Sequence, residues 1–525
     1  MPGISMHATA ETTAREAPTP PATSTDLVLV HGWGSNRHTW APLAGALAGQ
    51  FHLHYLELPG HGENREPWPD TPQELIDSWV ATLPPKAIYL GWSLGGSLAL
   101  LLAGRYPERV QAVVTLASNP CFVARADWCT AMAGQDFEHF RQRLVRDPAK
   151  LRRYFAGLQT LGDAKAADVR RQLEAEARRG EATPAGLAAG LDTLAGLDLR
   201  SCVQQLAVPH LALFGQQDAL VPCAVADSLP SRSSVWTLGD CGHALHLSRP
   251  EAVAARVVDF ALQRHPATAH PRKKSAVAAA FSRAEDYDRA ALLQQEAGTA
   301  LLQRLPRHRV DTLLDLGCGT GFFSQALKSR CHELIGLDLA EGMLRRARAN
   351  NGDVQWLCAD AENLPLERDS IDQVYSSLAV QWCEDLPRLA REIARVLQPG
   401  GELALATLGP DTLWELRAAW RAVDAQVHVN RFATHEEMHN AFAVAGLELV
   451  AHDAERWLRR VPQVRQLARE LRAIGAHNVN PGRQAGLTGK RRWQQLESAY
   501  RAIAGDAEDL PVTWALDFYR FRKPH

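Results

Sequence analysis

Short apolar runs alternate with longer amphipathic stretches in two separate parts of the chain. In the first part the runs LVLV, HLHYLEL, AIYLGW and AVVTLA are each followed by helix-like sequence, and the pattern resumes at HLALFG and SVWTLG. Such alternation is typical of a mostly parallel β-sheet with helices on both faces. A polar and helical stretch at about residues 127–198 interrupts it and predicts a helical insertion.

The second part repeats the alternation with unrelated residues. The runs TLLDLG, ELIGLD, VQWLCA, DQVYSS and ELALAT predict a second, independent α/β sheet. Between the two parts, residues 265–276 (HPATAHPRKKSA) are rich in proline, alanine and basic side chains and lack apolar periodicity, as expected of a linker. We therefore predict domains at residues 26–264 and 277–525, preceded by a disordered tail at residues 1–25.

Composition fits two globular domains and argues against several classes of protein. The 525 residues are 46% hydrophobic and 22% charged, and the formal net charge of −2 gives no overall attraction to nucleic acid or to an anionic membrane. Nine cysteines without a CxxC pair argue against a disulfide framework and against a zinc site, so we expect no metal. Because the sequence shows neither a secretory signal nor a long apolar span, we expect a cytoplasmic protein.

A candidate nucleophile stands between a predicted strand and a predicted helix of the first domain. Gly91-Trp92-Ser93-Leu94-Gly95 is a GxSxG sequence after the run AIYL and before SLALLLAGRYP. On such a turn the serine hydroxyl is exposed, and the flanking glycines permit a backbone that a side chain would block. Since GxSxG also occurs by chance in glycine-rich turns, its meaning depends on a base and an acid elsewhere.

Both partners follow in the required order. Asp218 comes after the predicted strand LALFG, and His243 comes later, just before the last helix of the domain. A serine nucleophile needs a histidine base, and the base needs an acid that orients it. The order Ser, Asp, His is that of α/β-hydrolases. We therefore predict Ser93, Asp218 and His243 as catalytic residues, with the backbone N–H groups of Leu94 and Trp33 as oxyanion donors.

The motifs HGWG, ELPGHG, GWSLGG, FAGLQTLG and GHALHLSRP together resemble the pimeloyl-[acyl-carrier-protein] methyl ester esterases of biotin synthesis, over about residues 26–264. The resemblance implies a serine esterase with a helical cap, at about residues 127–198, above the nucleophile. It also implies the substrate contacts. These are Trp33, Ser93, Leu94, Phe155, Ala156, Gly157, Leu158, Gln159 and His243.

The predicted cap carries an excess of positive charge. Residues 141–179 hold eleven basic and five acidic side chains, a local net charge of +6. A solvated helix face is the usual reason for a charge run. The alternative is a docking surface for an acidic acyl carrier protein, which would steer association without a basic whole protein.

A second glycine-rich loop opens the second domain. In LLDLGCGTG, the residues Gly317, Gly319 and Gly321 join a predicted strand to a helix in a GxGxG pattern, which differs from the GxGxxG of dinucleotide-binding enzymes. The next predicted strand ends in Asp338, whose carboxylate can accept both hydroxyls of a ribose. The third ends near Asp360, which suits an adenine amino group. Each aspartate alone could be a capping residue, but three features at successive strand ends favour a nucleoside site.

These features resemble class I S-adenosylmethionine-dependent methyltransferases. More narrowly, VAAAFSRAEDYD, the run from SSLAVQWCEDLP to ALATLG, and AAWRAVDAQVHVNRF resemble the malonyl-[acyl-carrier-protein] O-methyltransferases, most clearly up to Phe432. The resemblance implies a Rossmann-like fold and methyl transfer to a carboxylate, which needs alignment more than a base. The implied cofactor contacts are Asp315, Gly317, Cys318, Gly319, Gly321, Asp338, Asp360 and Ala361.

Four further residues are candidates for the acceptor side of the second domain. Phe281 and Tyr287 are candidates to close the pocket, Gln381 to face the methyl group, and Arg431 to hold the acceptor carboxylate. A purely structural role is the simpler interpretation of each.

Both resemblances point to one pathway. A methyl ester on a malonyl thioester would let a neutral chain enter the apolar sites of fatty-acid elongation, where a bare carboxylate carries a large desolvation cost. The esterase would restore the acid at the pimeloyl length, so an acyl carrier protein is the expected partner. Two alternatives stay open: a general carboxylesterase fused to a small-molecule methyltransferase, and one half that acts as a non-catalytic binding module.

Overall fold

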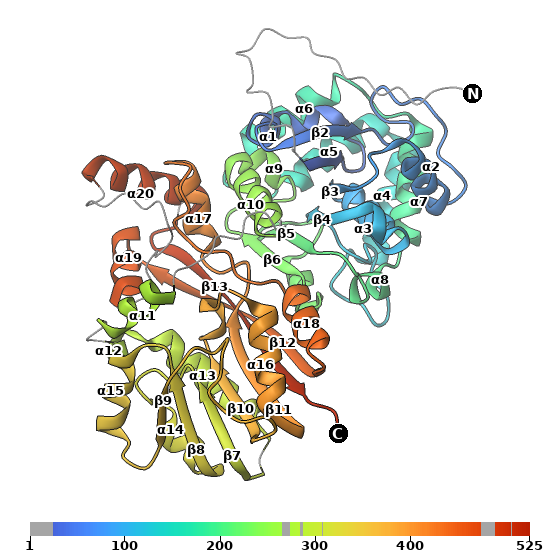
Figure 1. Cartoon of the computed structure of the whole chain (residues 1–525). Helices are drawn as coiled ribbons and strands as arrows, with labels where there is room; N and C mark the ends of the chain where they lie inside the picture. Colours follow the sequence, from blue (N-terminus) through green and yellow to red (C-terminus); the bar gives the residue numbers. More distant parts are fainter. Residues whose placement is uncertain (1–24, 265–273, 284–286, 307, 474–488, 506) are drawn as a thin grey trace. The chain divides into compact units, whose positions relative to one another are not determined.

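The computed structural model describes residues 25–264, 274–283, 287–306, 308–473, 489–505 and 507–525 (Figure 1). The chain divides into two compact units, residues 1–258 and 259–525. Residues 1–24 of the predicted tail and residues 265–273 of the predicted linker lie outside the described residues. The remaining linker positions, 274–276, form the first residues of helix α11.

The first unit contains one parallel six-stranded sheet with the strand order β2-β1-β3-β4-β5-β6. Strands β3 and β5 are buried at every position, as expected of strands covered on both faces. The predicted α/β fold of this half is confirmed. The strands are β1 (Thr25–Val30), β2 (Phe51–Leu56), β3 (Ala87–Trp92), β4 (Val110–Leu116), β5 (His210–Gly215) and β6 (Ser234–Leu238).

Four helices, α4 to α7, fall inside the segment predicted as a cap and pack against one another. Helix α3 follows β3 and packs on the sheet, with α2 and α8 as its neighbours. The helices are α1 (Ala41–Leu47), α2 (Pro72–Thr82), α3 (Leu94–Arg105), α4 (Gly134–Arg146), α5 (Pro148–Thr160), α6 (Ala166–Ala177), α7 (Pro184–Gly196), α8 (Arg200–Gln204), α9 (Leu245–Ser248) and α10 (Pro250–Gln263), and the boundary between the units falls within α10.

The second unit contains a seven-stranded sheet with the order β12-β13-β11-β10-β7-β8-β9. Five strands are parallel, whereas β13 runs antiparallel to both β11 and β12. The predicted Rossmann-like class is confirmed, and the antiparallel pair of β12 and β13 extends its sheet at one end. The strands are β7 (Val310–Leu316), β8 (Cys331–Asp338), β9 (Gln355–Cys358), β10 (Ile371–Ser377), β11 (Leu397–Leu408), β12 (Glu448–Val461) and β13 (Leu510–Arg522).

Apolar side chains on the two faces of this sheet form separate cores. Along β11, Ala404 and Ala406 belong to the core that includes α13, α17, α19 and α20, while Leu403 and Leu405 belong to the core that includes α16 and α18. This is the alternation of a strand covered on both faces. The helices are α11 (Lys274–Ser282), α12 (Tyr287–Ala290), α13 (Leu292–Arg304), α14 (Ser324–Lys328), α15 (Glu341–Asn350), α16 (Leu386–Val396), α17 (Trp414–Arg421), α18 (His435–Val444), α19 (Val464–Ala473) and α20 (Lys490–Ala504).

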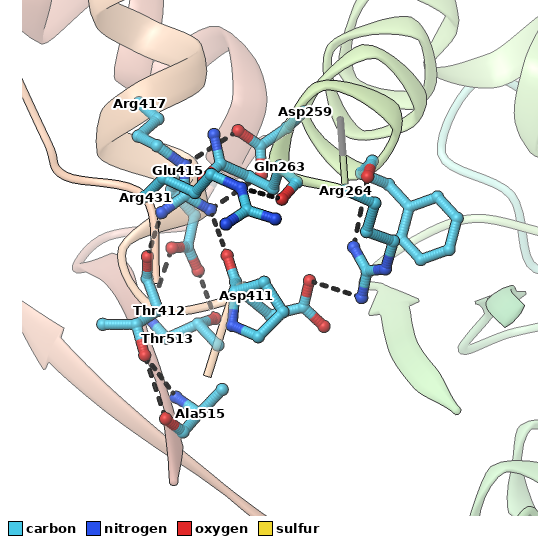
Figure 2. A network of polar contacts seen from close by, with 12 residues as sticks. Asp259, Gln263, Arg264, Asp411, Thr412, Glu415, Arg417, Arg431, Thr513 and Ala515 are labelled. Atoms are coloured by element: carbon cyan, nitrogen blue, oxygen red, sulfur yellow. Dashed lines mark hydrogen bonds and ion pairs between the residues drawn. The ribbon is translucent and has the colours of Figure 1, made fainter. Parts of the chain in front are cut away.

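Buried polar side chains fasten strand β13 to the segment that follows β11 (Figure 2). The Thr412 hydroxyl donates to the Ala515 carbonyl and accepts from the Ala515 N–H, both at 3.0 Å, and Glu415 accepts from the Thr513 N–H at 3.2 Å. The guanidinium of Arg417 donates to the Thr412 carbonyl. Because buried polar groups destabilise a fold when they lack a partner, this network fixes the register of strand β13 beside β11.

Among the helices that the structure describes, none combines the length and the apolar sequence that a membrane span requires.

Candidate active sites

Ser93 occupies a strained turn between β3 and α3. Its backbone has φ 54° and ψ −117°, a conformation that few residues other than glycine adopt. A Cβ atom on Gly95 would lie 2.2 Å from the Val30 carbonyl oxygen, and one on Gly91 would lie 2.3 Å from the Gly95 carbonyl oxygen. Both flanking glycines are therefore required by the close approach of neighbouring backbone.

Asp218 and His243 meet in the interior of the first unit. Asp218 Oδ2 lies 2.8 Å from His243 Nδ1, and Oδ1 accepts the N–H groups of Leu220 and Val221 at 2.8 and 3.0 Å. The aspartate is thus held by backbone donors and in turn orients the imidazole. His243 Nε2 is buried and forms no hydrogen bond within the described residues, so the contact with the Ser93 hydroxyl is not closed in this conformation.

The backbone around His243 is held from the end of cap helix α5. The Gln159 carbonyl accepts the His243 N–H at 3.0 Å. Asp163 accepts the Gly242 N–H at 2.9 Å through one carboxylate oxygen and the Ser248 hydroxyl at 2.9 Å through the other. The position of the base therefore depends on the cap, through Asp163, which the sequence analysis missed. Its only signal was its place directly after the FAGLQTLG motif.

Two buried histidines shape the loop expected to provide an oxyanion donor. His31 Nε2 accepts the Leu58 N–H at 3.1 Å, and His61 Nε2 accepts the Gly34 N–H at 3.2 Å. Burial lowers the pKa of His31 to about 4 and, together with the nearby His31, that of His61 to about 3. Both rings are therefore neutral at pH 7, which lets each accept a backbone N–H beside Trp33.

Aromatic side chains fill the space above Ser93. The Trp33 ring contacts Phe155 edge-on at 5.0 Å between centroids and Phe140 at 5.3 Å, and its Nε1 donates to the Leu187 carbonyl of α7 at 2.8 Å. The cavity that remains beside Ser93 measures about 20 Å³. Such a space holds about one water molecule, so an acyl chain can enter only if the cap side chains move.

The predicted ester-binding residues separate into groups in the structure. Trp33, Ser93 and Phe155 line the cavity. Leu94 begins α3, where its N–H has no acceptor inside the helix, as an oxyanion donor requires. The remaining predicted contacts do not line the cavity in this conformation. These are Ala156, Gly157, Leu158, Gln159 and His243.

The second unit contains a cavity of about 120 Å³ at the carboxyl ends of β7, β8 and β9. Of the predicted cofactor contacts, Gly317, Gly319, Asp338, Asp360 and Ala361 line it. The candidates Phe281 and Tyr287 line it too, and their rings meet edge-on at 6.3 Å. The other predicted contacts, Asp315, Cys318 and Gly321, do not line the cavity.

The glycine loop carries backbone conformations that few residues other than glycine adopt. Gly317 and Gly319 have φ of 78° and 56°, and the Gly319 N–H donates to Asp338 Oδ2 at 3.0 Å. Asp338 Oδ1 accepts the Ala340 N–H at 2.7 Å. Each carboxylate oxygen keeps a further acceptor position, so Asp338 can still receive ligand hydroxyl groups.

Asp315 lies buried behind the glycine loop. Burial, with the negative charge of Asp338, raises the pKa of Asp315 to about 8. Burial also raises the pKa of Asp338, although backbone hydrogen bonds oppose that rise. The site thus concentrates carboxyl groups whose ionisation is unfavourable until a cation arrives, which suits a positively charged ligand.

Lys274 is a residue of this cavity that the sequence analysis assigned to the linker. Its ammonium nitrogen lies 2.6 Å from Asp360 Oδ2 and 2.7 Å from Glu362 Oε2. Burial disfavours its charge, but the hydrogen bonds and charges of the two carboxylates raise its pKa above the ordinary value. Through these ion pairs Lys274 links helix α11 to the edge of the cavity. No sequence motif indicated this role.

A larger cavity, of about 770 Å³, adjoins the first. Val380 and Cys383 line both cavities, so the two are neighbours. The acceptor candidates Gln381 and Arg431 line the larger one. Arg431 is 2.8 Å from Glu437 Oε1, and Gln381 Nε2 donates to the Leu378 carbonyl at 2.6 Å. A second ligand could therefore lie beside the first.

Comparison with known proteins agrees with both folds. A family of proteins described by an alpha/beta hydrolase fold matches residues 26–250, and one described as a methyltransferase domain matches residues 314–405. The biotin biosynthesis bifunctional protein BioHC of Cellvibrio japonicus is 39% identical over 504 residues, which cover 95% of this chain and 99% of that protein.

Two further relatives show the same division. The BioHC protein of Teredinibacter turnerae is 35% identical and covers 98% of this chain and 95% of its own length. A malonyl-[acyl-carrier protein] O-methyltransferase of Methylovorus is 41% identical over 265 residues, which are 48% of this chain and 89% of that protein. Two relatives named as bifunctional proteins therefore match nearly the whole length of this chain.

The hydrogen bond from the Gly242 N–H to the Asp163 carboxylate predicts that Asp163 positions the loop that carries His243. Replacing Asp163 with alanine removes the acceptor of the Gly242 N–H, and we expect kcat for a small soluble ester to fall about tenfold or more, because small displacements of a catalytic group are costly. Asp168→Ala, at an exposed position on α6, is the matched control. Steady-state kinetics with p-nitrophenyl butyrate measures both, and equal kcat values for the two variants would contradict the role.

Proposed function

This chain belongs to the family of biotin biosynthesis bifunctional BioHC proteins, and from that premise we propose the two reactions that it performs. Its second unit transfers a methyl group from S-adenosylmethionine to the free carboxyl group of malonyl-[acyl-carrier protein]. Its first unit hydrolyses the methyl ester of pimeloyl-[acyl-carrier protein]. The observation that carries the proposal is the 39% identity to a BioHC protein over 95% of the chain.

In the esterase, each step has a residue suited to it. The Ser93 hydroxyl attacks the ester carbonyl while His243 Nε2 takes its proton, and Asp218 keeps His243 Nδ1 protonated and oriented. The oxyanion is received by the N–H groups of Leu94 and Trp33. The proton then passes from His243 to the departing methanol, and water releases the acid by the same steps in reverse order. The 2.8 Å contact between Asp218 and His243 supports this assignment.

In the methyltransferase, the residues position the reactants more than they exchange protons. S-adenosylmethionine supplies an electrophilic methyl group when bound. Asp338 would accept the ribose hydroxyls, and the neighbourhood of Asp360 would receive the adenine. The adjoining cavity of about 770 Å³, with Gln381 and Arg431 in its wall, would hold the acyl acceptor. These residues would hold the acceptor carboxylate in line with that methyl group, and because a carboxylate is already ionised at neutral pH, the residues would need to supply no general base.

The two reactions are chemically opposed, so the esterase must discriminate between chain lengths. We propose that the cap provides this selectivity. The cavity beside Ser93 is about 20 Å³ and its walls are aromatic. A long apolar chain gains free energy for each buried methylene, about 0.8 kcal/mol, which can offset the displacement of Phe140 and Phe155. A malonyl methyl ester has too few methylenes to do so.

Variants of the full chain should separate the two activities. Ser93→Ala removes the nucleophile, and we expect it to abolish hydrolysis of carrier-bound pimeloyl methyl ester and to leave methylation of carrier-bound malonate unchanged. Asp338→Ala should have the reverse effect. Mass spectrometry of both carrier-bound substrates, with and without S-adenosylmethionine, reads the two reactions together. Loss of both activities in either variant would contradict independent sites.

The raised pKa of Asp315 predicts a pH-dependent affinity for the cofactor. Below about pH 8 the carboxyl group is largely protonated in the free protein. Because a cationic cofactor favours the ionised form, binding releases a proton, so affinity should rise from pH 6 to pH 8, by up to about tenfold per unit, and then level off. Calorimetry of S-adenosylmethionine binding measures this slope. Asp315→Asn should flatten it, and an equal slope in that variant would exclude Asp315 as the cause.

Selectivity by the cap predicts a strong dependence on acyl length. We expect kcat/KM for carrier-bound pimeloyl methyl ester to exceed that for malonyl methyl ester by about a hundredfold or more, because four added methylenes contribute about 3 kcal/mol of burial. Phe155→Ala enlarges the cavity and should bring the kcat/KM values for the two esters closer together. Comparable kcat/KM values for the two esters in the unmodified chain would exclude the cap as the source of selectivity.

A further inference from the structure

Helix α19 of the methyltransferase unit has one apolar face and one basic face. Val464 and Leu467 are buried in the core shared with α20. Arg465, Arg469 and Arg472 are exposed and recur at intervals of four and three residues. That spacing places the three guanidinium groups in one stripe along the helix.

The stripe belongs to a wider excess of positive charge. The described residues 456–473 and 489–501 contain ten basic side chains and two acidic ones, in a chain whose formal net charge is −2. Lys490 and Arg491 are exposed at the start of α20, which packs against α19. Such local concentration in a nearly neutral chain creates a field that attracts an acidic partner.

Internal ion pairs account for other arginines of this region but not for the stripe. Arg459 pairs with Glu296, and Arg492 pairs with Asp424. In contrast, Arg465, Arg469 and Arg472 form no ion pair with a carboxylate in the part of the chain that the structure describes. Arg465 lies 5.8 Å from the centre of the Trp493 ring, so it packs on the helix pair and still presents its charge to solvent.

These two helices adjoin the elements that wall both cavities. Helix α19 contacts α12, whose Tyr287 lines the cofactor cavity. On the α20 side, Arg492 pairs with Asp424, which is also bonded to His428 at 2.8 Å. The residues after His428 form the wall of the larger cavity, at 430–433. Direct contacts therefore connect the basic surface to elements that line both cavities.

We propose that Arg465, Arg469, Arg472, Lys490 and Arg491, the α19–α20 surface, dock the acidic carrier protein that delivers the malonyl thioester to the methyltransferase. The inference rests on the proposed function and adds to it the surface that recognises the carrier. It differs from the basic cap of the esterase, which lies in the other unit. Each active site would then have its own docking surface for the same kind of partner.

The geometry favours a small acidic protein over nucleic acid. The stripe spans residues 465–472, seven steps or about 10 Å along the helix axis, which matches a single acidic helix rather than an extended phosphate backbone. Binding of single-stranded nucleic acid also uses exposed aromatic platforms. The aromatic side chain of this surface, Trp493, is half-buried and faced by Arg465.

Charge reversal in the full chain tests the proposal. The variant Arg465→Glu, Arg469→Glu, Arg472→Glu should raise KM for carrier-bound malonate about tenfold or more at low salt and reduce the salt dependence of kcat/KM, because the steering charge is lost. Methylation of malonyl-N-acetylcysteamine, an acceptor without a carrier, and the affinity for S-adenosylmethionine should not change. Circular dichroism checks that α19 still folds.

Two further variants provide matched controls. Arg345→Glu, Arg368→Glu, Arg391→Glu makes the same change in net charge at exposed positions of the same unit and should leave both reactions unchanged. In the cap, Arg146→Glu, Lys150→Glu, Arg153→Glu replaces exposed cations of the esterase and should impair hydrolysis of carrier-bound pimeloyl methyl ester only.

The outcomes separate the docking surface from the proposed function. If the unmodified chain methylates neither malonyl acceptor, the proposed function fails. The docking surface is wrong if the unmodified chain methylates both acceptors and the α19 variant has an unchanged KM for the carrier-bound acceptor. It is also wrong if that variant loses methylation activity equally on both acceptors. Unchanged KM together with loss of binding to a single-stranded RNA oligonucleotide would overturn it in favour of nucleic acid.

Discussion

Access to Ser93 depends on the same cap segment that holds His243, the proposed general base, in place. Trp33 and Phe155 close the space above Ser93, and only about 20 Å³ remains. Helix α5, which carries Phe155, ends at Thr160. Gln159 in its last turn and Asp163 just after it hold the backbone of His243 and Gly242. His243 Nε2 has no hydrogen-bond partner among the described residues. We infer that movement of this helix to admit a chain would also shift His243, which would couple substrate entry to completion of the proposed triad.

The methyltransferase unit faces an electrostatic constraint instead of a steric one. Its cavity gathers Asp338 and Asp360 around a glycine loop, with Asp315 buried behind it, and Lys274 is bound to Asp360. Burial disfavours the ionisation of Asp315, and the negative charge of Asp338 adds to this effect, so the pKa of Asp315 is raised to about 8. A bound cation would favour the ionised form of these carboxyl groups. Their interaction with the cation would therefore contribute part of the free energy of binding.

Most of both folds could be predicted from sequence, because parallel strands with glycine-rich turns leave a strong periodic pattern. The GxSxG turn requires glycine at Gly95 because neighbouring backbone approaches closely. The GxGxG loop requires it at Gly317 because of a positive φ of 78° and a close contact with the Ala379 side chain. Both requirements leave a recognisable sequence pattern. The order Ser93, Asp218, His243 likewise predicted an aspartate–histidine contact, and the structure contains it at 2.8 Å. The catalytic and binding roles of these residues stay predictions.

What the sequence did not indicate depends on contacts between distant segments. Strands β12 and β13 pair with each other across an intervening stretch of about fifty residues, and β12 is largely exposed, so its hydrophobic pattern is weak. The side chains of Asp163 and Lys274 each make two polar contacts with segments far away in the chain, and no local spacing marks either residue. Three of the expected cofactor contacts do not line the cavity, since a motif identifies a loop more reliably than the atoms that face a ligand.

The central claim is that one chain adds a methyl ester and removes it only after the acyl chain has grown. The most direct measurement follows a trideuterated methyl group from labelled S-adenosylmethionine through carrier-bound malonate in the presence of the full chain and a fatty-acid elongation system. The account predicts that the label stays on the carrier-bound chain until the pimeloyl length and then appears as trideuterated methanol. Release of labelled methanol at the malonyl stage, before any elongation, would contradict it.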